Sequence, residues 1–66
     1  MTFKELMKHK GFTQVELAAA LGMKQSTISG WATGSNLPRT KQVPLIAKAL
    51  GVSVNTLIKS FEEEQL

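Results

Sequence analysis

The chain has 66 residues, of which eight are Lys or Arg and five are Asp or Glu, and it contains no cysteine. This length predicts one small domain over residues 1–66, and the missing cysteines exclude both a disulfide framework and a cysteine-ligated zinc site. No apolar run approaches the roughly 20 residues of a membrane span, and the first ten residues do not resemble a signal peptide. We therefore expect a cytoplasmic protein without a membrane partner.

The charge is unevenly distributed. Three of the five acidic residues are Glu62–Glu64, so residues 1–61 carry eight basic and two acidic side chains, a net charge of +6. This distribution favours an anionic polymer such as nucleic acid as a partner, although Lys-rich small domains are often simply soluble. The acidic tail at 62–66 either extends the last helix or is frayed.

The sequence contains little that suggests catalysis. His9 is the only histidine, and no nucleophile–base pair is visible. Glu5 and Glu16 both have a structural explanation as capping residues. We expect no metal site, no cofactor, no small-molecule ligand and no enzymatic activity.

The first predicted helix begins after Thr2, which forms a capping-box pattern with Glu5, and it runs to about His9. Its inward side chains are expected to be Phe3, Leu6 and Met7.

The segment TQVELAAALG predicts the next helix. Thr13 and Glu16 have the spacing of a second capping box, and Gly22 lies where a left-handed residue is expected to end the helix. The chain restarts within three residues, and residues 25–33 form the following helix. This is the spacing of a helix-turn-helix, whose second helix lies in the DNA major groove. The apolar stripe of the first of these two helices is predicted to be Val15, Leu17, Ala18 and Leu21.

The helix at 25–33 has two different sides. At about 100° per residue, Thr27, Ile28 and Trp31 lie on the inward side, where core packing explains Trp31 better than base stacking. Gly30 costs roughly 1 kcal/mol in a helix relative to Ala, which suggests that this side of the helix approaches a base edge closely. An ordinary surface helix is also polar outside, so the DNA-binding interpretation depends equally on the caps and the glycine turn. The outward residues are Gln25, Ser26, Ser29, Gly30 and Thr33.

Two further helices are predicted after a polar loop at 35–40, in which Leu37 is expected to lie beneath the domain. The fourth helix starts near 41–43, with Pro44 in its first turn, and Gly51 ends it. Ser53 caps a fifth helix. The stripe of that helix is Val54, Leu57, Ile58 and Phe61.

Together these blocks resemble the lambda-repressor-like, Cro/C1-type family of helix-turn-helix DNA-binding domains. The resemblance lies in the Phe3–Leu6 stripe, in TQVELAAALG and QSTISGWATG, in Pro38 and in IAKALGVSVNTL at 46–57, and it covers nearly the whole chain. It implies a compact, all-α domain of five helices and a transcriptional regulator that binds operator DNA, usually as a symmetric dimer. Many family members pair an Arg with an acidic residue where this chain has Met7 and Ala32, so we expect an apolar replacement of that ion pair.

The resemblance also assigns DNA contacts by position, and Gln25 has the strongest chemical claim because its amide can bond adenine N6 and N7 together. The residues expected at base edges are Lys24, Gln25, Ser26 and Ser29. The residues expected along the DNA backbone are Gln14, Thr33, Asn36, Arg39, Thr40 and Lys41.

The fifth helix carries more apolar surface than one small core requires. We expect Val54, Ile58 and Phe61 to form a dimer surface, giving a weak homodimer at least on DNA; the other interpretation is that this stripe only closes the monomer core. The sequence therefore predicts a phage or plasmid Cro-type repressor that binds a palindromic operator through the helix at 25–33. The alternative is an antitoxin-like module whose C-terminal helix docks on a partner protein.

Overall fold

The computed structural model describes residues 1–64, and these form five α-helices without a strand. The predicted all-α architecture is confirmed. Residues 65 and 66 of the predicted acidic tail lie outside the described part, and the helix before them extends to Glu64. The helices are α1 (Phe3–His9), α2 (Gln14–Leu21), α3 (Gln25–Thr33), α4 (Val43–Leu50) and α5 (Val54–Glu64).

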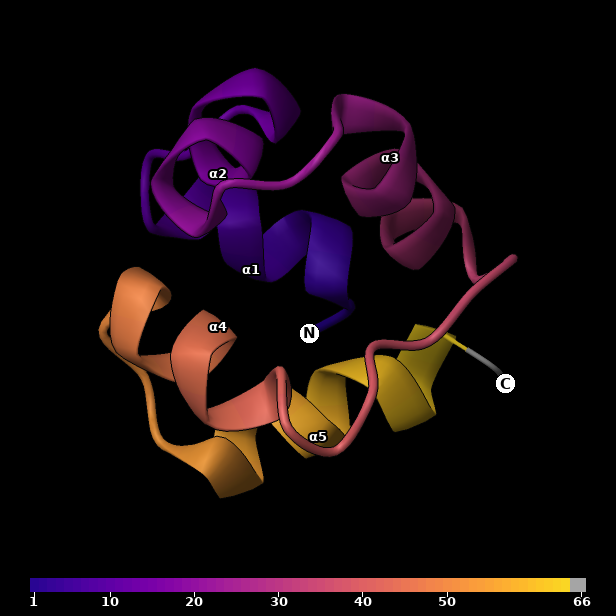
Figure 1. Ribbon diagram of the computed structural model, residues 1–66. Coiled ribbons are helices and arrows are strands. Elements are labelled where there is room, and N and C mark those ends of the chain that lie inside the picture. The colour runs from indigo at the N-terminus through magenta and orange to yellow at the C-terminus, as the bar shows by residue number, and fades with distance from the viewer. Residues whose placement is uncertain (65–66) are drawn as a thin grey trace.

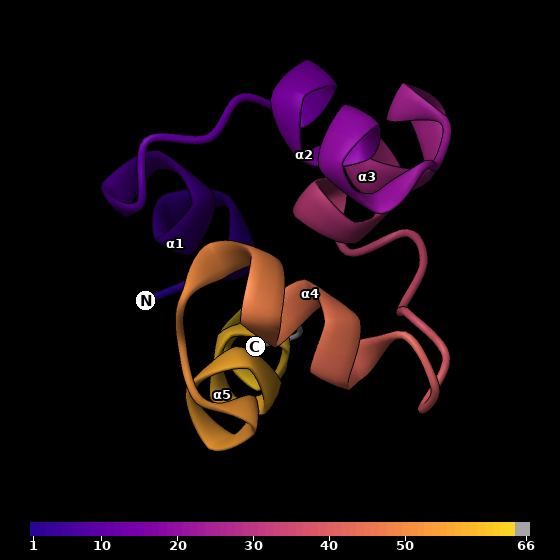
Figure 2. The same ribbon diagram turned by 60° about the vertical axis from the view of Figure 1, so that its left-hand side comes forward.

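The helices form two pairs with α1 between them. Figure 1 shows α2 and α3 in the upper half of the molecule, α4 and α5 in the lower half and α1 in the centre, and Figure 2 shows the same grouping from another side. Helix α1 contacts both α3 and α5, while α2 also packs against α4. No helix within residues 1–64 is long and apolar enough to cross a membrane.

Both predicted capping boxes are present. The backbone N–H of Thr13 donates to Glu16 Oε1 at 2.9 Å, and the N–H of Glu16 donates to Thr13 Oγ1 at 3.1 Å. The N–H of Thr2 likewise donates to Glu5 Oε1 at 2.9 Å. This hydrogen bond, together with that to the Thr2 side chain, lowers the pKa of Glu5 below its usual value. Each box satisfies N–H groups that a helix start leaves unpaired.

The later helix boundaries also match the sequence. Pro44 lies in the first turn of α4, and Gly51 ends this helix. Ser53 caps α5 by accepting a hydrogen bond from the N–H of Thr56 at 3.1 Å.

Three aromatic rings join the two halves of the core. Phe3 of α1 meets Trp31 of α3 edge to face, with ring centroids 6.1 Å apart, and stacks on Phe61 of α5 at 4.7 Å. Met7 and Ala32 are also buried in this cluster, as expected for the apolar replacement of the family's ion pair. The buried core comprises Phe3, Leu6, Met7, Leu17, Ala18, Ile28, Trp31, Ala32, Ile46, Ala47, Leu50, Leu57 and Phe61.

Three sequence predictions are wrong. Val15 is 58% exposed. At about 100° per residue, its side chain points away from the buried side of α2, which is formed by Leu17 and Ala18. Phe61 is buried in the core, so it is not part of an exposed dimer surface. Leu37 is 51% exposed, and it lies at the edge of an open hollow that Ile58 and Phe61 also line, so it does not fill the core.

Candidate nucleic-acid interface

Helices α2 and α3 are joined by a tight turn centred on Gly22. The φ angle of Gly22 is 66°, in the left-handed region where residues other than glycine are strained. Its N–H donates to the carbonyl of Ala19, and the N–H of Met23 donates to the carbonyl of Ala18 at 2.9 Å. These bonds end α2 and let α3 start at Gln25, which gives the predicted helix-turn-helix.

The inward side of α3 is fully engaged in the core. Ile28, Trp31 and Ala32 are 0%, 1% and 3% exposed. The predicted packing role of Trp31 is therefore confirmed, and its ring is not accessible for stacking on a base. This burial fixes which side of α3 faces solvent.

The four residues predicted to contact bases are brought together on the outward side of α3 and at its start. Lys24, Gln25 and Ser26 are exposed, and Ser29 one turn later is half-buried. Lys24 precedes the helix, and no side chain caps its N-terminus. This end of the helix carries a partial positive charge, so the surface suits an anionic partner.

The residues predicted to contact the DNA backbone lie at the start of α2, at the end of α3 and in the loop that follows it. Gln14 is half-buried in the first turn of α2, and Arg39, Thr40 and Lys41 are exposed in the loop between α3 and α4. Thr33 is exposed at the end of α3, but its hydroxyl donates to the carbonyls of Ser29 and Gly30 at 3.1 and 3.3 Å. That hydroxyl keeps only its acceptor capacity for a ligand.

Sequence reasoning missed the residue that shapes this loop. The amide oxygen of Gln42 accepts a hydrogen bond from the N–H of Arg39 at 2.8 Å, and the N–H of Gln42 donates to the carbonyl of Arg39 at 2.8 Å. The pair fixes the backbone that carries Arg39 and Lys41. A polar residue directly before the helix start at Val43 was the one available signal.

The structure gives Gly30 a neighbour that the sequence did not indicate. A Cβ at position 30 would overlap the Nδ2 atom of Asn36 and lie 3.2 Å from its Cγ atom. The N–H of Asn36 also donates to the carbonyl of Gly30 at 3.2 Å. Within the protein, the space beside Gly30 is therefore filled by the side chain of Asn36, whereas the predicted close approach of Gly30 to a base edge stays a prediction.

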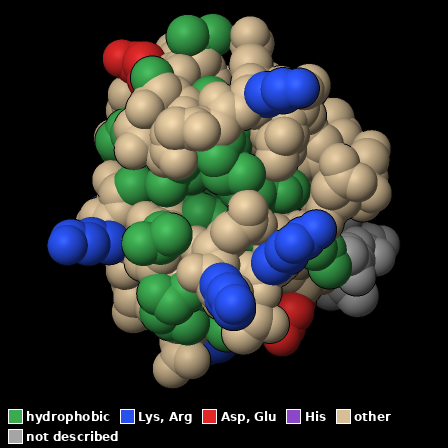
Figure 3. All heavy atoms as spheres, viewed as in Figure 1, with side chains coloured by type: hydrophobic (Ala, Val, Ile, Leu, Met, Phe, Trp, Pro, Cys, Tyr) green, Lys and Arg blue, Asp and Glu red, His purple; other side chains and the backbone are tan. Residues whose placement is uncertain are grey.

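The space-filling view shows the charge pattern around these elements. In Figure 3, Lys and Arg side chains are spread around a central area of hydrophobic side chains, and acidic side chains are fewer on this face. Independently of this view, the exposed large hydrophobic side chains include Leu37, Leu45, Val54 and Ile58.

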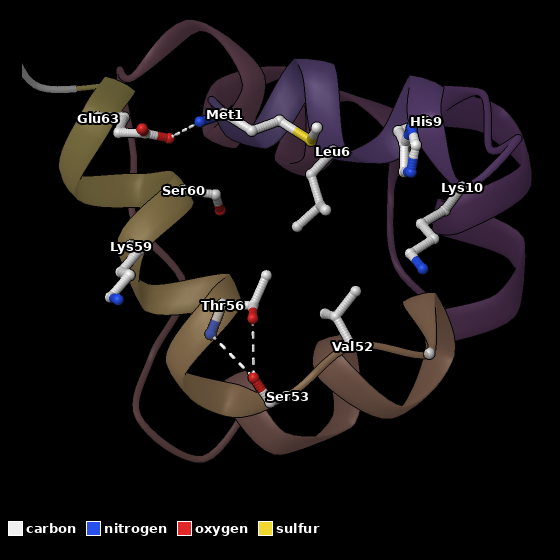
Figure 4. A pocket seen from close by; sticks show the side chains of 11 residues that line it. Met1, Leu6, His9, Lys10, Val52, Ser53, Thr56, Lys59, Ser60 and Glu63 are labelled. Carbon is white, nitrogen blue, oxygen red and sulfur yellow. Dashed lines mark hydrogen bonds and ion pairs between the residues drawn. The ribbon is translucent and has the colours of Figure 1, made fainter.

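A separate hollow of about 490 Å³ lies between α1 and the start and inner side of α5 (Figure 4). None of its lining residues belongs to α2 or α3. Several of its polar groups already have partners: Ser53 bonds Thr56, Ser60 donates to a carbonyl, and the amino group of Met1 pairs with Glu63. No group of three His, Cys, Asp or Glu residues within 1–64 is arranged to hold a metal ion.

Comparison with known proteins agrees with this geometry. The family model for helix-turn-helix domains matches residues 3–57. The chain therefore belongs to the helix-turn-helix family, a class of domains that place their second motif helix in the DNA major groove.

The chain is similar to the regulatory protein cro of Pseudomonas phage D3. The two are 48% identical over 46 residues, which cover 70% of this chain and 56% of that protein. The chain thus spans little more than half the length of this relative.

Proposed function

We propose that this protein is a sequence-specific DNA-binding transcriptional regulator of the Cro type, with α3 as the recognition helix. The observation that carries the proposal is the division of α3 into a buried side at Ile28 and Trp31 and an exposed polar side at Gln25 and Ser26. A helix held rigidly from behind presents its outward side chains to a groove in a fixed register.

The outward side chains have different capacities for reading bases. Gln25 is the principal reader, because its carboxamide forms a donor–acceptor pair with adenine N6 and N7. Lys24 reaches guanine O6 or a phosphate, and the hydroxyls of Ser26 and Ser29 add weaker hydrogen bonds. No Arg lies on this helix, so recognition does not depend on a forked guanidinium contact to guanine.

The neighbouring elements hold the DNA backbone. Gln14 lies at the start of α2, where free N–H groups attract a phosphate. The Thr40 hydroxyl donates to a phosphate oxygen, and the Thr33 hydroxyl does so only by turning away from the carbonyls of Ser29 and Gly30. Arg39 and Lys41 supply charge. Each phosphate neutralised by such a side chain contributes about −0.9 to the slope of log affinity against log salt.

We further infer that two copies bind a palindromic operator as a weak dimer. Val54 and Ile58 on α5 are 40% and 42% exposed, and Ile58 lines a shallow hollow of about 210 Å³ with the exposed Leu37. A twofold pair doubles the DNA contacts and selects half-sites about one helical turn apart. A phage or plasmid repressor of this kind acts in the host cytoplasm.

Sedimentation velocity, with and without DNA, tests the dimer. Ile58→Lys should shift the population to monomer, whereas Leu45→Lys, which changes an even more exposed apolar side chain on α4 (62% against 42%), should leave it unchanged. Monomeric wild-type protein both free and on DNA would overturn the dimer. A different protein that co-purifies stoichiometrically through α5 would instead support the antitoxin-like alternative.

Selection from randomised duplex DNA at about 150 mM salt tests the function as a whole. We expect a palindrome with half-sites about ten base pairs apart, bound far more tightly than scrambled DNA. Weak binding that ignores sequence and disappears with added salt would contradict the proposal, because that behaviour requires only charge.

A further inference from the structure

The hollow between α1 and α5 has an apolar middle. Its volume of about 490 Å³ lies within the roughly 300–1,000 Å³ that is typical of sites for small organic ligands. Leu6 of α1 is 3% exposed, and Val52 in the turn before α5 is half-buried. Both side chains point into the hollow, together with the methyl group of Thr56 (Figure 4). These groups offer van der Waals contacts to an apolar chain.

One end of the hollow is basic. Lys10, directly after α1, extends toward the turn at Gly51, and the ring of His9 lies beside it (Figure 4). Both side chains are exposed. Within residues 1–64, Lys10 makes no ion pair, and Glu63, the acidic residue that lines the hollow, is already paired with the amino group of Met1. The charge left without a partner at this end is therefore positive.

The helix ends near Lys10 make little demand on its charge. Helices α1 and α4 both end beside the hollow, and a helix C-terminus carries a partial negative charge. However, the carbonyl of Met7 accepts a hydrogen bond from the N–H of Phe12 at 2.9 Å, and the carbonyl of Ala47 accepts one from the N–H of Val52 at 3.0 Å. Because backbone groups already satisfy these carbonyls, the Lys10 ammonium group stays available to a ligand.

The hollow is separate from the surfaces proposed for DNA binding and for the dimer. None of its lining residues belongs to α2 or α3. On α5 it is lined by Thr56 and Ser60, whereas Ile58 lines a different hollow together with Leu37. A molecule bound between α1 and α5 would therefore leave the outward side of α3 uncovered.

We propose that this hollow binds a small aliphatic monocarboxylate, with its carboxylate at Lys10 and its chain over Leu6 and Val52. The ammonium group of Lys10 and a ring N–H of His9 are donors for carboxylate oxygens. One positive charge matches a monoanion, because Lys59, which also borders the hollow, lies on the outer side of α5 (Figure 4). The sequence predicted no small-molecule ligand, since no local pattern marks a hollow formed by segments far apart in the chain.

A series of straight-chain carboxylates tests the proposal with the full chain. We expect affinity to rise from acetate to hexanoate by up to about 4-fold for each CH₂ group that is buried. In NMR titrations at constant pH and ionic strength, the methyl signals of Leu6, Val52 and Thr56 should shift, while the amide signals of α3 should not. The uncharged 1-hexanol, which has a chain of the same length, should bind more weakly than hexanoate.

Lys10→Gln tests the basic end of the hollow. The variant should bind hexanoate about 2- to 5-fold more weakly, as expected for the loss of an exposed ion pair, and its affinity for 1-hexanol should not change. Lys8→Gln is the matched control, because it removes the same charge from an exposed position of α1 that does not line the hollow. Circular dichroism shows whether each variant is folded.

Four results would overturn the proposal. The first is the absence of hexanoate binding at millimolar concentration. Equal affinity for acetate and hexanoate would mean that Lys10 attracts only exchangeable counterions, and equal affinity for 1-hexanol and hexanoate would mean that the charge is not recognised. An equal loss in Lys8→Gln and Lys10→Gln would show that binding follows net charge alone. None of these measurements uses DNA, so this proposal and the proposed function fail independently of each other.

Discussion

The two sides of α3 lie in different environments, one buried in the core and the other exposed to solvent. Ile28 and Trp31 are buried against α1 and the rest of the core, so their size and shape determine stability. Gln25 and Ser26 are exposed, so substitutions there change little in the monomer. If α3 reads DNA as proposed, stability and recognition can be changed separately within its nine residues.

The largest effect is expected from Trp31→Ala. Removing a buried aromatic side chain from a core costs about 3–5 kcal/mol, and Trp31 also makes the edge contact with Phe3. A domain this small has little stability in reserve, so most of the protein should unfold. Urea denaturation followed by circular dichroism measures the loss, and a stable, folded variant would show that the inward side of α3 is not the structural one.

Gln25→Ala should have the opposite pattern. Its free energy of unfolding should stay close to that of wild type, because Gln25 is exposed at the start of α3. Discrimination at one base pair of each half-site should fall by about 1–3 kcal/mol. Titration of the selected site and its single-base variants measures this, and an unaltered preference would remove Gln25 from the base readers.

Thr13→Ala tests whether the cap of α2 supports the motif. The substitution deletes the acceptor for the Glu16 N–H, and loss of such a cap costs about 1 kcal/mol. The midpoint of thermal unfolding should fall, while base preferences stay the same. A changed base preference in this variant would mean that the capping box also positions α3.

Arg39→Gln should weaken binding to all DNA sequences alike. The side chain lies in the loop after α3 and is exposed, so its loss should remove the proposed phosphate contact without changing the core. The slope of log affinity against log salt should become shallower by about 0.9. The same slope in Arg39→Gln as in wild type would place Arg39 away from the DNA.

The smallest effect concerns pH. The Thr2 N–H bond lowers the pKa of Glu5 in the folded protein, so ionised Glu5 stabilises the fold at pH values above the ordinary Glu pKa. This contribution is lost as the pH falls through the lowered pKa of the folded state. The difference in thermal midpoint between wild type and Glu5→Gln should therefore shrink on acidification, and a constant difference would contradict the cap's role.

Features that depend on nearby residues could be predicted from the sequence. The two ends of α2 are set by residues within one or two turns of each other. The Thr13–Glu16 capping box marks its start and Gly22 marks its end, so the sequence was sufficient to predict these boundaries and the helix-turn-helix. Trp31 was predicted to be buried because its spacing from Ile28 is helical. The family pattern then added the positions of the expected DNA contacts.

Features that depend on distant contacts were not predictable in the same way. Leu37 was expected to lie beneath the domain, but it is 51% exposed. Phe61 was expected at an exposed surface, but it stacks on Phe3, 58 residues away in the chain. The meeting of Asn36 with Gly30 depends on how the loop folds back along α3, and no local pattern encodes that path.

In the proposed function, the outward side of α3 and the loop after it form the DNA-binding surface. Titration of ¹⁵N-labelled protein with the selected duplex, followed by amide chemical shifts, tests it most directly. We expect the largest changes at the start of α2, along Lys24–Ser29 and in the loop from Asn36 to Lys41, with α1 little affected. Changes confined to α1 and the hollow beside α5, with α3 unmoved, would contradict the account.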